Sequence, residues 1–169
     1  IQRILVDELR ADMIEVNAPT AISRLDTSLL ILLHRSLISG TEHSEVVAGR
    51  LRSTRAYIAG ADGDILYVPP SPEEVAPRLV ELFTWWRDAY IGAIVSDPVE
   101  IVHTLARLHH GIASVMPFLD GNGRLARLVT DQAARELLGE TVAIDLTTDR
   151  PNYFHALRAA DEGSFDELA

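Results

Sequence analysis

Between two segments with helical periodicity the chain reads Met116-Pro117-Phe118-Leu119-Asp120-Gly121-Asn122-Gly123-Arg124-Leu125-Ala126-Arg127. The two glycines that flank Asn122 permit unusual backbone angles, so that successive N–H groups can converge on one anion. A helix that begins near Arg124 adds the positive end of its dipole, and Arg127 follows on the same helical face. Asp120, directly before the glycines, is suited to hold Mg²⁺ between two phosphates. The stretch therefore predicts a phosphate-binding loop between two helices.

The same residues also fit a less specific structure. A Gly-x-Gly turn before a helix is commonly a plain connection, and two arginines at this spacing commonly form a solvent-exposed face. The stretch is not a Walker A loop, because Gly-x-x-x-x-Gly-Lys followed by Ser or Thr is absent from the sequence. The residues alone leave phosphate binding and a plain connection open.

Helical periodicity extends over most of the chain on both sides of this stretch. Apolar residues at helical spacing predict a helix over residues 3–15 and another over 21–38, which Gly40 is placed to end. After the central stretch, helices are expected over residues 124–138 and 152–162.

Two further helices have explicit start signals. Ser71, Pro72 and Glu74 form a capping-box sequence with proline at the first helical position, which predicts a long helix from there. Asp97 begins a similar signal ahead of a central helix. That helix must end before Pro117, because the residue that precedes a proline is pushed out of helical geometry.

One β-hairpin is expected among these helices. Residues 55–59 and 65–68 flank a segment with Asp-Gly turn chemistry. Residues 141–146 are a further short β-branched segment. The predicted fold class is all-α, a helical bundle with one small β-hairpin.

Composition limits the partners of the chain. Its 169 residues include 25 Asp and Glu but only 15 Lys and Arg, a net charge of −10, so no nucleic-acid partner is expected. The absence of cysteine excludes disulfides and thiolate metal sites. No apolar run is long enough to span a bilayer and no signal peptide opens the sequence, so we expect no membrane association and a cytoplasmic location.

The length fits one domain over residues 1–169, with an N-terminal helical extension over 1–24 and a core over 25–169. The sequence begins without a methionine, and residues 164–169 resemble the start of an interrupted helix. We therefore expect a fragment of a longer protein. Association with further copies of the chain is left open.

The central stretch resembles the signature of the Fic family, His-Pro-Phe-x-Asp/Glu-Gly-Asn-Gly-Arg-x-x-Arg. It matches every fixed position from Pro117 to Arg127, and differs only at the first, where Met116 replaces the histidine. Similarity also includes residues 49–52 and 67–75 upstream and residues 150–157 downstream, so that it covers roughly residues 25–169.

The resemblance implies a protein adenylyltransferase (AMPylation) domain that binds ATP and Mg²⁺. It would transfer AMP to a Ser, Thr or Tyr hydroxyl of a target protein, docked at the flap hairpin that runs from Thr54 to Val68. The family roles would fall on a few residues of the signature: Asp120 as the Mg²⁺ ligand, Gly121, Asn122 and Gly123 at the α- and β-phosphates, Arg124 at the distal phosphates, Arg127 as a brace, Phe118 as a buried anchor and Met116 at the general-base position.

Met116 has no useful basicity, because a thioether does not accept a proton near neutral pH. Catalysis is therefore predicted to be impaired while nucleotide binding is kept. Three explanations of Met116 stay open: a naturally degenerate site, a substitution made to inactivate the protein, or altered chemistry that uses water or another base. The alternative function is a non-catalytic nucleotide-binding or protein-interaction module, a pseudoenzyme.

No other histidine is predicted to replace the missing base. His109 and His110 lie in the preceding helix and do not obviously reach the loop; His109 is expected in the core and His110 at the surface. A zinc site made from His103, His110 and Asp120 matches no standard ligand spacing. The remaining histidines carry no signal in the sequence: His34, His43 and His155.

Overall fold

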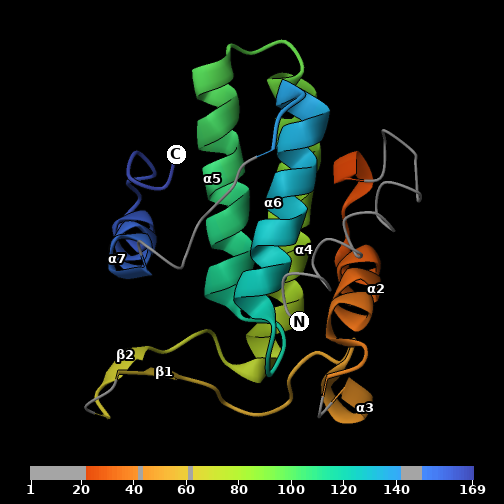
Figure 1. The fold of residues 1–169 in the computed structure, drawn as a ribbon, viewed down its shortest axis with the longest axis vertical. Helices are drawn as coiled ribbons and strands as arrows, with labels where there is room; N and C mark the ends of the chain where they lie inside the picture. Colours follow the sequence, from red (N-terminus) through yellow and green to blue (C-terminus); the bar gives the residue numbers. More distant parts are fainter. Residues whose placement is uncertain (1–21, 42–43, 61–62, 142–149) are drawn as a thin grey trace.

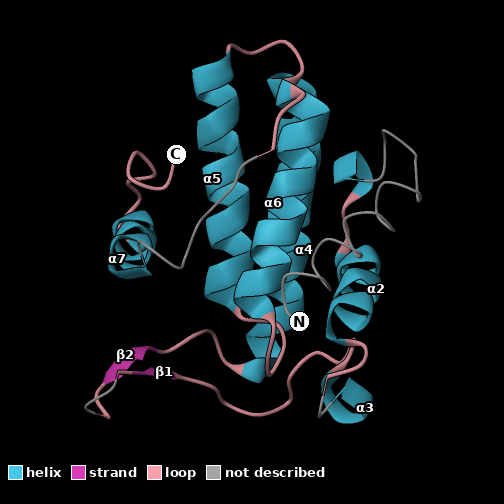
Figure 2. Cartoon of the chain, viewed as in Figure 1, coloured by secondary structure: helices cyan, strands magenta, loops and turns pink. Residues whose placement is uncertain are grey.

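The computed structural model describes residues 22–41, 44–60, 63–141 and 150–169. These residues form mainly helices and one two-stranded antiparallel sheet (Figure 2). In chain order the elements are η1 (Ile22–Arg24), α2 (Thr27–Ile38), α3 (Ser44–Val47), β1 (Ile58–Ala59), β2 (Ile65–Tyr67), α4 (Pro72–Ala93), α5 (Pro98–Val115), α6 (Asn122–Leu138) and α7 (Arg150–Asp161). The predicted all-α bundle with one small β-hairpin is confirmed. None of the described helices is long and apolar enough to cross a lipid bilayer.

Helices α4, α5 and α6 form the centre of the bundle (Figure 1). Helix α5 packs on both α4 and α6, and α2 packs on α4 and α6 in turn. The side chains between these helices are apolar, and Trp86, Leu108, Ile112 and Leu125 have almost no exposed surface. Burial of each such leucine or isoleucine stabilises the fold by roughly 1.5–3 kcal/mol. The core thereby fixes the ends of α5 and α6, which the predicted phosphate-binding loop joins.

Both predicted start signals cap their helices. Ser71 and Glu74 form a capping box at the start of α4. At α5, one carboxylate oxygen of Asp97 accepts hydrogen bonds from the N–H groups of Val99 (2.9 Å) and Glu100 (3.1 Å). These bonds satisfy N–H groups that have no acceptor within their own helix.

The expected helix over residues 21–38 is interrupted, so that prediction was wrong in its extent. A 3₁₀ turn, η1, precedes α2, and Asp26 caps α2 by accepting a hydrogen bond from the Leu29 N–H (2.8 Å). Aspartate competes for backbone N–H groups in this way and favours a helix start over a helix interior. The carbonyl of Ile22 instead accepts a hydrogen bond from the buried Trp86 indole (2.7 Å).

Other expected elements differ in extent, among them α7, which begins two residues earlier and ends one residue earlier than expected. Helix α6 starts at Asn122, two residues before the expected start, because Gly121 takes the N-cap position with φ 79° and ψ 0°. The hairpin strands are shorter than expected and pair Ile58 with Tyr67 and Ala59 with Ile65. The expected helix over 3–15 and all but the first residue of the segment 141–146 lie outside the described residues.

The hairpin lies at one end of the bundle (Figure 1). The loop that joins α5 to α6 is at the same end, and the loop between α4 and α5 is at the opposite end. A hydrogen bond connects hairpin and bundle, because the Tyr67 hydroxyl donates to the carbonyl of Ser114 near the end of α5 (2.9 Å). The fold therefore brings the hairpin and the loop between α5 and α6 to one end of the molecule.

Candidate functional site

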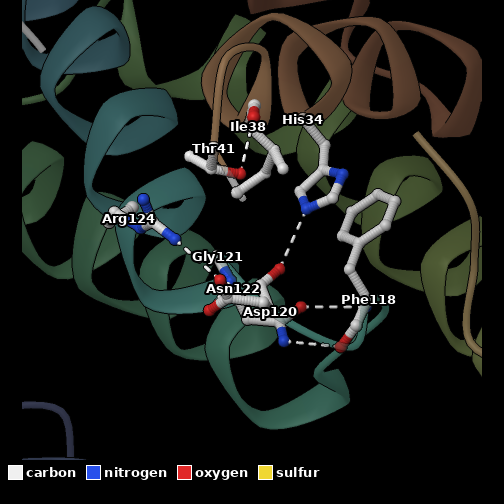
Figure 3. A network of polar contacts seen from close by, with 8 residues as sticks. All are labelled: His34, Ile38, Thr41, Phe118, Asp120, Gly121, Asn122 and Arg124. Atoms are coloured by element: carbon white, nitrogen blue, oxygen red, sulfur yellow. Dashed lines mark hydrogen bonds and ion pairs between the residues drawn. The ribbon is translucent and has the colours of Figure 1, made fainter. Parts of the chain in front are cut away.

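The signature loop, residues 116–121, turns the chain from α5 into α6. Met116 begins it in the left-handed conformation (φ 45°, ψ 61°) and is the one non-glycine with positive φ in the part of the chain that the structure describes. Asn122 closes the loop from within: its side-chain amide donates to the carbonyl of Phe118 (2.7 Å) and accepts from the Phe118 N–H (2.9 Å). Phe118 is fully buried, as predicted. The amide of Asn122 thus braces the loop (Figure 3).

The N-terminus of α6 is open toward a ligand. Gly121 is its N-cap and no side chain caps this end. The Leu125 N–H donates to the carbonyl of Gly121 (2.9 Å), so the N–H groups of Asn122, Gly123 and Arg124 precede the hydrogen-bonded turns. Such N–H groups, together with the positive end of the helix dipole, form an anion-binding site.

Gly121 is required by the packing of the loop against α2. A Cβ atom at this position would lie 2.7 Å from Cδ1 of Ile38 and 3.3 Å from Nε2 of His34. Its φ of +79° is also unfavourable for a residue with a side chain. At Gly123 the nearest atom to such a Cβ is Nη1 of Arg127, at 3.4 Å. Gly123 therefore serves no packing need of this kind, and its missing side chain leaves space above the helix end.

Asp120 and Arg124 form an ion pair at the mouth of the loop. One carboxylate oxygen of Asp120 accepts from the Gly121 N–H (2.6 Å), and the other lies 3.0 Å from Nη2 of Arg124. The Asp120 side chain is 67% exposed, so a ligand can reach it. No cluster of three or more His, Cys, Asp or Glu occurs among the described residues. A single exposed carboxylate nevertheless fits Mg²⁺, which proteins bind through one or two carboxylates together with substrate phosphates.

A chain of polar side chains connects Arg127 to the interior of the bundle. Its guanidinium interacts with the hydroxyl of Tyr153 on α7. That hydroxyl lies 2.8 Å from Nε2 of His109, whose Nδ1 lies 3.3 Å from the Thr130 hydroxyl. Because Thr130 donates its proton to the carbonyl of Ala126, His109 carries its proton on Nδ1 and accepts at Nε2.

His109 is a core residue, as predicted, and not a base for the site. Burial is the main cause that lowers the pKa of His109 to about 4, so the imidazole is neutral at pH 7. Its nitrogens are both engaged within the bundle. His110, expected at the surface, is instead largely covered and contacts Asp161 of α7 (2.7 Å).

The structure does not bring His103, His110 and Asp120 together into a group that could hold a metal ion. His103 lies 3.7 Å from Asp166, His110 pairs with Asp161, and Asp120 pairs with Arg124. His155 contacts Glu167. His43 lies outside the described residues.

His34 supports the loop, a role that the sequence analysis did not predict. It is fully buried on α2, and its ring stacks on Phe118 with 3.7 Å between centroids. Nδ1 accepts from the Gly49 N–H (2.9 Å), so the proton is on Nε2, which donates to the carbonyl of Asp120 (2.9 Å; Figure 3). Burial lowers the pKa of His34 and keeps it neutral. The helical spacing of Leu30, His34 and Leu37 on one buried face was the available signal.

Arg52 is the second supporting residue that sequence reasoning missed. Its side chain is 3% exposed, and it lies beside the start of the signature loop. The guanidinium donates hydrogen bonds to backbone carbonyls of α5, of the loop and of the segments that flank the hairpin: Val115, Met116, Thr54 and Pro70. No local pattern indicates these contacts, since the partners on α5 and the loop are more than 60 positions away in the sequence.

A cavity of about 220 Å³ lies between the hairpin, α5 and α7. Its walls are mainly apolar with a few polar groups. The lining comprises Ile58, Leu66, Tyr67, His110, Ala113, Ser114, Phe154, Leu157, Arg158 and Asp161. Ser114 is two residues before Met116 in the sequence, so the cavity adjoins the end of α5 that leads into the loop. Cavities with apolar walls and few polar groups are typical of small-molecule sites.

Comparison with known proteins matches this chain to one family. The model of the Fic/DOC family matches residues 24–134. The protein adenylyltransferase Fic of Drosophila grimshawi is 29% identical over 150 residues, which are 88% of this chain and 28% of that protein. The protein adenylyltransferase fic-1 of Caenorhabditis elegans is 30% identical over 134 residues, 79% of this chain and 24% of that protein. The chain spans about a quarter of the length of these relatives.

Solved structures share the fold. A Fic-domain signaling protein from Bacteroides thetaiotaomicron superposes with a TM-score of 0.72 at 21% identity, over 98% of this chain and 58% of that one. The BepC protein of Bartonella tribocorum, solved with bound AMPPNP, superposes with a TM-score of 0.62 at 19% identity, over 98% of this chain and 83% of that one. At such identities the likeness concerns the fold alone.

Proposed function

The chain belongs to the Fic/DOC family, and from this premise we propose that it is the nucleotide-binding domain of a protein adenylyltransferase, with catalysis impaired at Met116. The observation that carries the proposal is the open N-terminus of α6, where Gly121 leaves the first N–H groups free of any side-chain cap. A helix end of this kind binds phosphate groups. The named relatives are adenylyltransferases, which supports ATP as the nucleotide.

The cavity beside the hairpin supports a nucleoside triphosphate over a simple phosphate. Its apolar walls, which include Leu66 and Phe154, suit the faces of a flat base. The carboxylate of Asp161 lies at its lining, where it can accept a hydrogen bond from the amino group of adenine. We therefore assign the base to this cavity and the phosphates to the N-terminus of α6.

The ion pair of Asp120 with Arg124 supports the metal assignment. Asp120 would hold Mg²⁺ together with the phosphates, and the bound ion would neutralise part of their charge. Arg124 would then exchange its carboxylate partner for a phosphate, with which it forms charge-assisted hydrogen bonds. Arg127, held by Tyr153, would keep the floor of the site rigid.

The exposed hairpin would dock the target protein. Tyr57, Ile65 and Val68 present apolar surface to solvent, and such a strand edge can pair with an extended peptide. In the transfer, the hydroxyl oxygen of the target forms a bond to the α-phosphorus. The bond from that phosphorus to the oxygen of the β-phosphate breaks, pyrophosphate leaves, and the hydroxyl proton passes to a base.

Met116 cannot accept this proton, so we expect transfer to be slower by about 10²–10⁴-fold than with a base in place. The test is Met116→His, with Met116→Ala as the control. Each protein is incubated with labelled ATP, Mg²⁺ and a cell lysate, and covalent label on protein is counted. Transfer by Met116→His alone supports an impaired transferase.

Equal transfer by all three proteins would mean that another group serves as the base. Binding of ATP without labelling by any of them would favour the second candidate, a non-catalytic nucleotide-binding or protein-interaction module. The intact loop combined with the missing base favours that candidate specifically, because binding does not require a proton acceptor.

A further inference from the structure

Arg52 places a positive charge inside the protein, beside the end of α5. Its Nε donates to the carbonyl of Met116 (2.7 Å), and its Nη2 donates to the carbonyl of Val115 (3.3 Å). Carbonyls at the C-terminus of a helix have no N–H donor within the helix, and they form the negative end of its dipole. The buried guanidinium is therefore matched to this helix end in both charge and geometry.

These two hydrogen bonds fix the peptide planes on both sides of the Cα atom of Met116. The carbonyl of Val115 belongs to the plane before that atom, and the carbonyl of Met116 belongs to the plane after it. The backbone N–H of Arg52 also donates to the carbonyl of Pro117 (2.9 Å), which fixes the next plane. Since φ and ψ describe the rotation between neighbouring planes, Arg52 determines both angles at position 116.

The angles that result are unusual for this residue. Met116 is left-handed, with φ 45° and ψ 61°, although it has a side chain and is not stabilised there as glycine would be. A single residue in this conformation persists only where its surroundings impose it. The direction of the bond from Cα to Cβ follows from the same two angles.

We infer that Arg52 is the positioning residue of the site, which sets the direction of the side chain at position 116 by fixing the backbone on both sides of it. The inference rests on the proposed function, in which position 116 is that of the general base. In this role Arg52 acts through residue 116 and the hairpin, whose backbone carbonyls it contacts.

The same guanidinium also joins the hairpin to this position. Nη1 donates to the carbonyl of Thr54 (3.2 Å) and Nη2 to that of Pro70, one on each side of the hairpin. A target docked on the hairpin is thereby held at a defined place relative to residue 116. Arg52 is thus a common fixed point for the base position and the docking element.

The first test measures the backbone of Met116 directly in the otherwise unchanged chain. Only two methionines occur in the sequence, so selective ¹³C,¹⁵N-methionine labelling gives two backbone NMR signals, and Met13→Leu assigns them. The Cα and carbonyl shifts report φ and ψ. In Arg52→Lys we expect the Met116 shifts to leave their left-handed values, because one ammonium group cannot bond both carbonyls in the guanidinium geometry.

Arg50→Ala, at an exposed arginine two positions away, is the control and should leave the Met116 signal unchanged. Arg52→Ala extends the series. If Arg52→Ala does not fold, Arg52→Lys, which retains the charge and most of the volume, decides the matter. Unchanged Met116 shifts in a folded Arg52→Lys protein would overturn the inference.

The second test measures transfer by the Met116→His protein. Adding Arg52→Lys should lower kcat by about 10–100-fold, since a base displaced by about 1 Å is that much less effective. The Kd for ATP should change by less than about threefold, because the phosphate site at α6 is untouched. General unfolding would instead lower kcat and raise the apparent Kd together. An unchanged kcat would overturn the inference. If Met116→His transfers no AMP at all, the proposed function fails, and the methionine signals still decide whether Arg52 holds residue 116.

Discussion

Asn122 illustrates how single residues of the loop divide their work between shape and binding. Both polar atoms of its side-chain amide are bonded to the backbone of Phe118, within the buried interior. Only its backbone N–H is therefore directed to a ligand at the start of α6. The resemblance assigned Asn122 to the phosphates, and the structure adds that its side chain stabilises the loop.

Asn122→Ala should lower the free energy of unfolding by about 1–3 kcal/mol, because a buried N–H and a buried carbonyl of Phe118 lose their partners. ATP affinity should fall as well, since the loop loses its internal brace. Urea unfolding and calorimetric titration measure the two effects. Leu119→Ala is the matched control, because Leu119 is 53% exposed in the same loop. Equal stability of the two variants would contradict this account.

The two glycines of the loop should respond differently to alanine. Gly121→Ala should destabilise the fold by about 1–3 kcal/mol, because its Cβ would meet Ile38 at 2.7 Å in a left-handed backbone. Gly123→Ala should cost little stability, since Gly123 lies within α6 and alanine is the better helix former. Its ATP affinity should nevertheless fall, because the methyl group occupies the space of a phosphate. Thermal unfolding with and without ATP separates these outcomes, and a stable Gly123→Ala protein that binds ATP normally would place the phosphates elsewhere.

Among the elements, α5, α6 and α7 are connected by His109. Its imidazole lies on α5, bonds Thr130 of α6 and Tyr153 of α7, and through Tyr153 reaches Arg127. Protonation would remove the acceptor at Nε2 and place a charge in the core. The packing of three helices around the site thus depends on a neutral histidine.

This dependence predicts an effect of pH on stability. The pKa of His109 is about 4 in the folded chain and about 6.5 when unfolded, so the unfolded chain binds more protons between these values. The stabilisation is complete above the unfolded pKa and is lost as pH falls toward the folded one. Between pH 7.5 and 5.5 the loss should be about 1 kcal/mol.

The measurement is urea unfolding at both pH values for wild type and His109→Gln. His109→Gln lacks this component, so its stability should fall by about 1 kcal/mol less over the interval. His155→Gln, at an exposed histidine, is the control and should follow wild type. An identical pH dependence of wild type and His109→Gln would show that folding does not lower the pKa of His109.

Local sequence signals predicted the helices and strands well, but they could not predict contacts between residues far apart in the sequence. Ser71 and Asp97 act as caps in the structure because a cap involves only the next few residues. The roles of His34 and Arg52 could not be predicted, because their bonds to the loop join residues 86 and 64 positions apart. The interruption before α2 was missed because apolar spacing continued through Asp26. The sequence pattern thus identified the loop. The side chains that support the loop could be identified only from the three-dimensional structure.

The net charge of the whole molecule has the same sign as the charge of the proposed nucleotide ligand. The net charge of −10 opposes the approach of an anionic nucleotide, so binding must come from a local set of donors. Arg124 and the N–H groups at the start of α6 are the donors that the structure offers at the loop. Any stabilisation of the fold by ATP should therefore depend on these groups and not on the net charge of the molecule.

ATP with Mg²⁺ should consequently raise the unfolding temperature of the whole chain. Binding to the folded state alone stabilises it by about 2.7 kcal/mol at a ligand concentration of 100 Kd. For a chain of this size each kcal/mol corresponds to roughly 2–4 °C, so the shift should reach about 5–10 °C at that saturation. Calorimetry or dye-based unfolding over a series of ATP concentrations measures it.

Three variants and the omission of Mg²⁺ locate the source of this shift. Arg124→Ala should reduce it strongly, because it removes charge-assisted bonds to the phosphates. Met116→Ala should leave it nearly unchanged, since the thioether contributes no such bond. Omission of Mg²⁺ and Asp120→Asn should each weaken the shift, because Asp120 is the single exposed carboxylate that the loop offers to the ion. The absence of any shift at millimolar ATP would count against nucleotide binding. Equal effects of Arg124→Ala and Met116→Ala would instead mean that the phosphates do not lie at the N-terminus of α6.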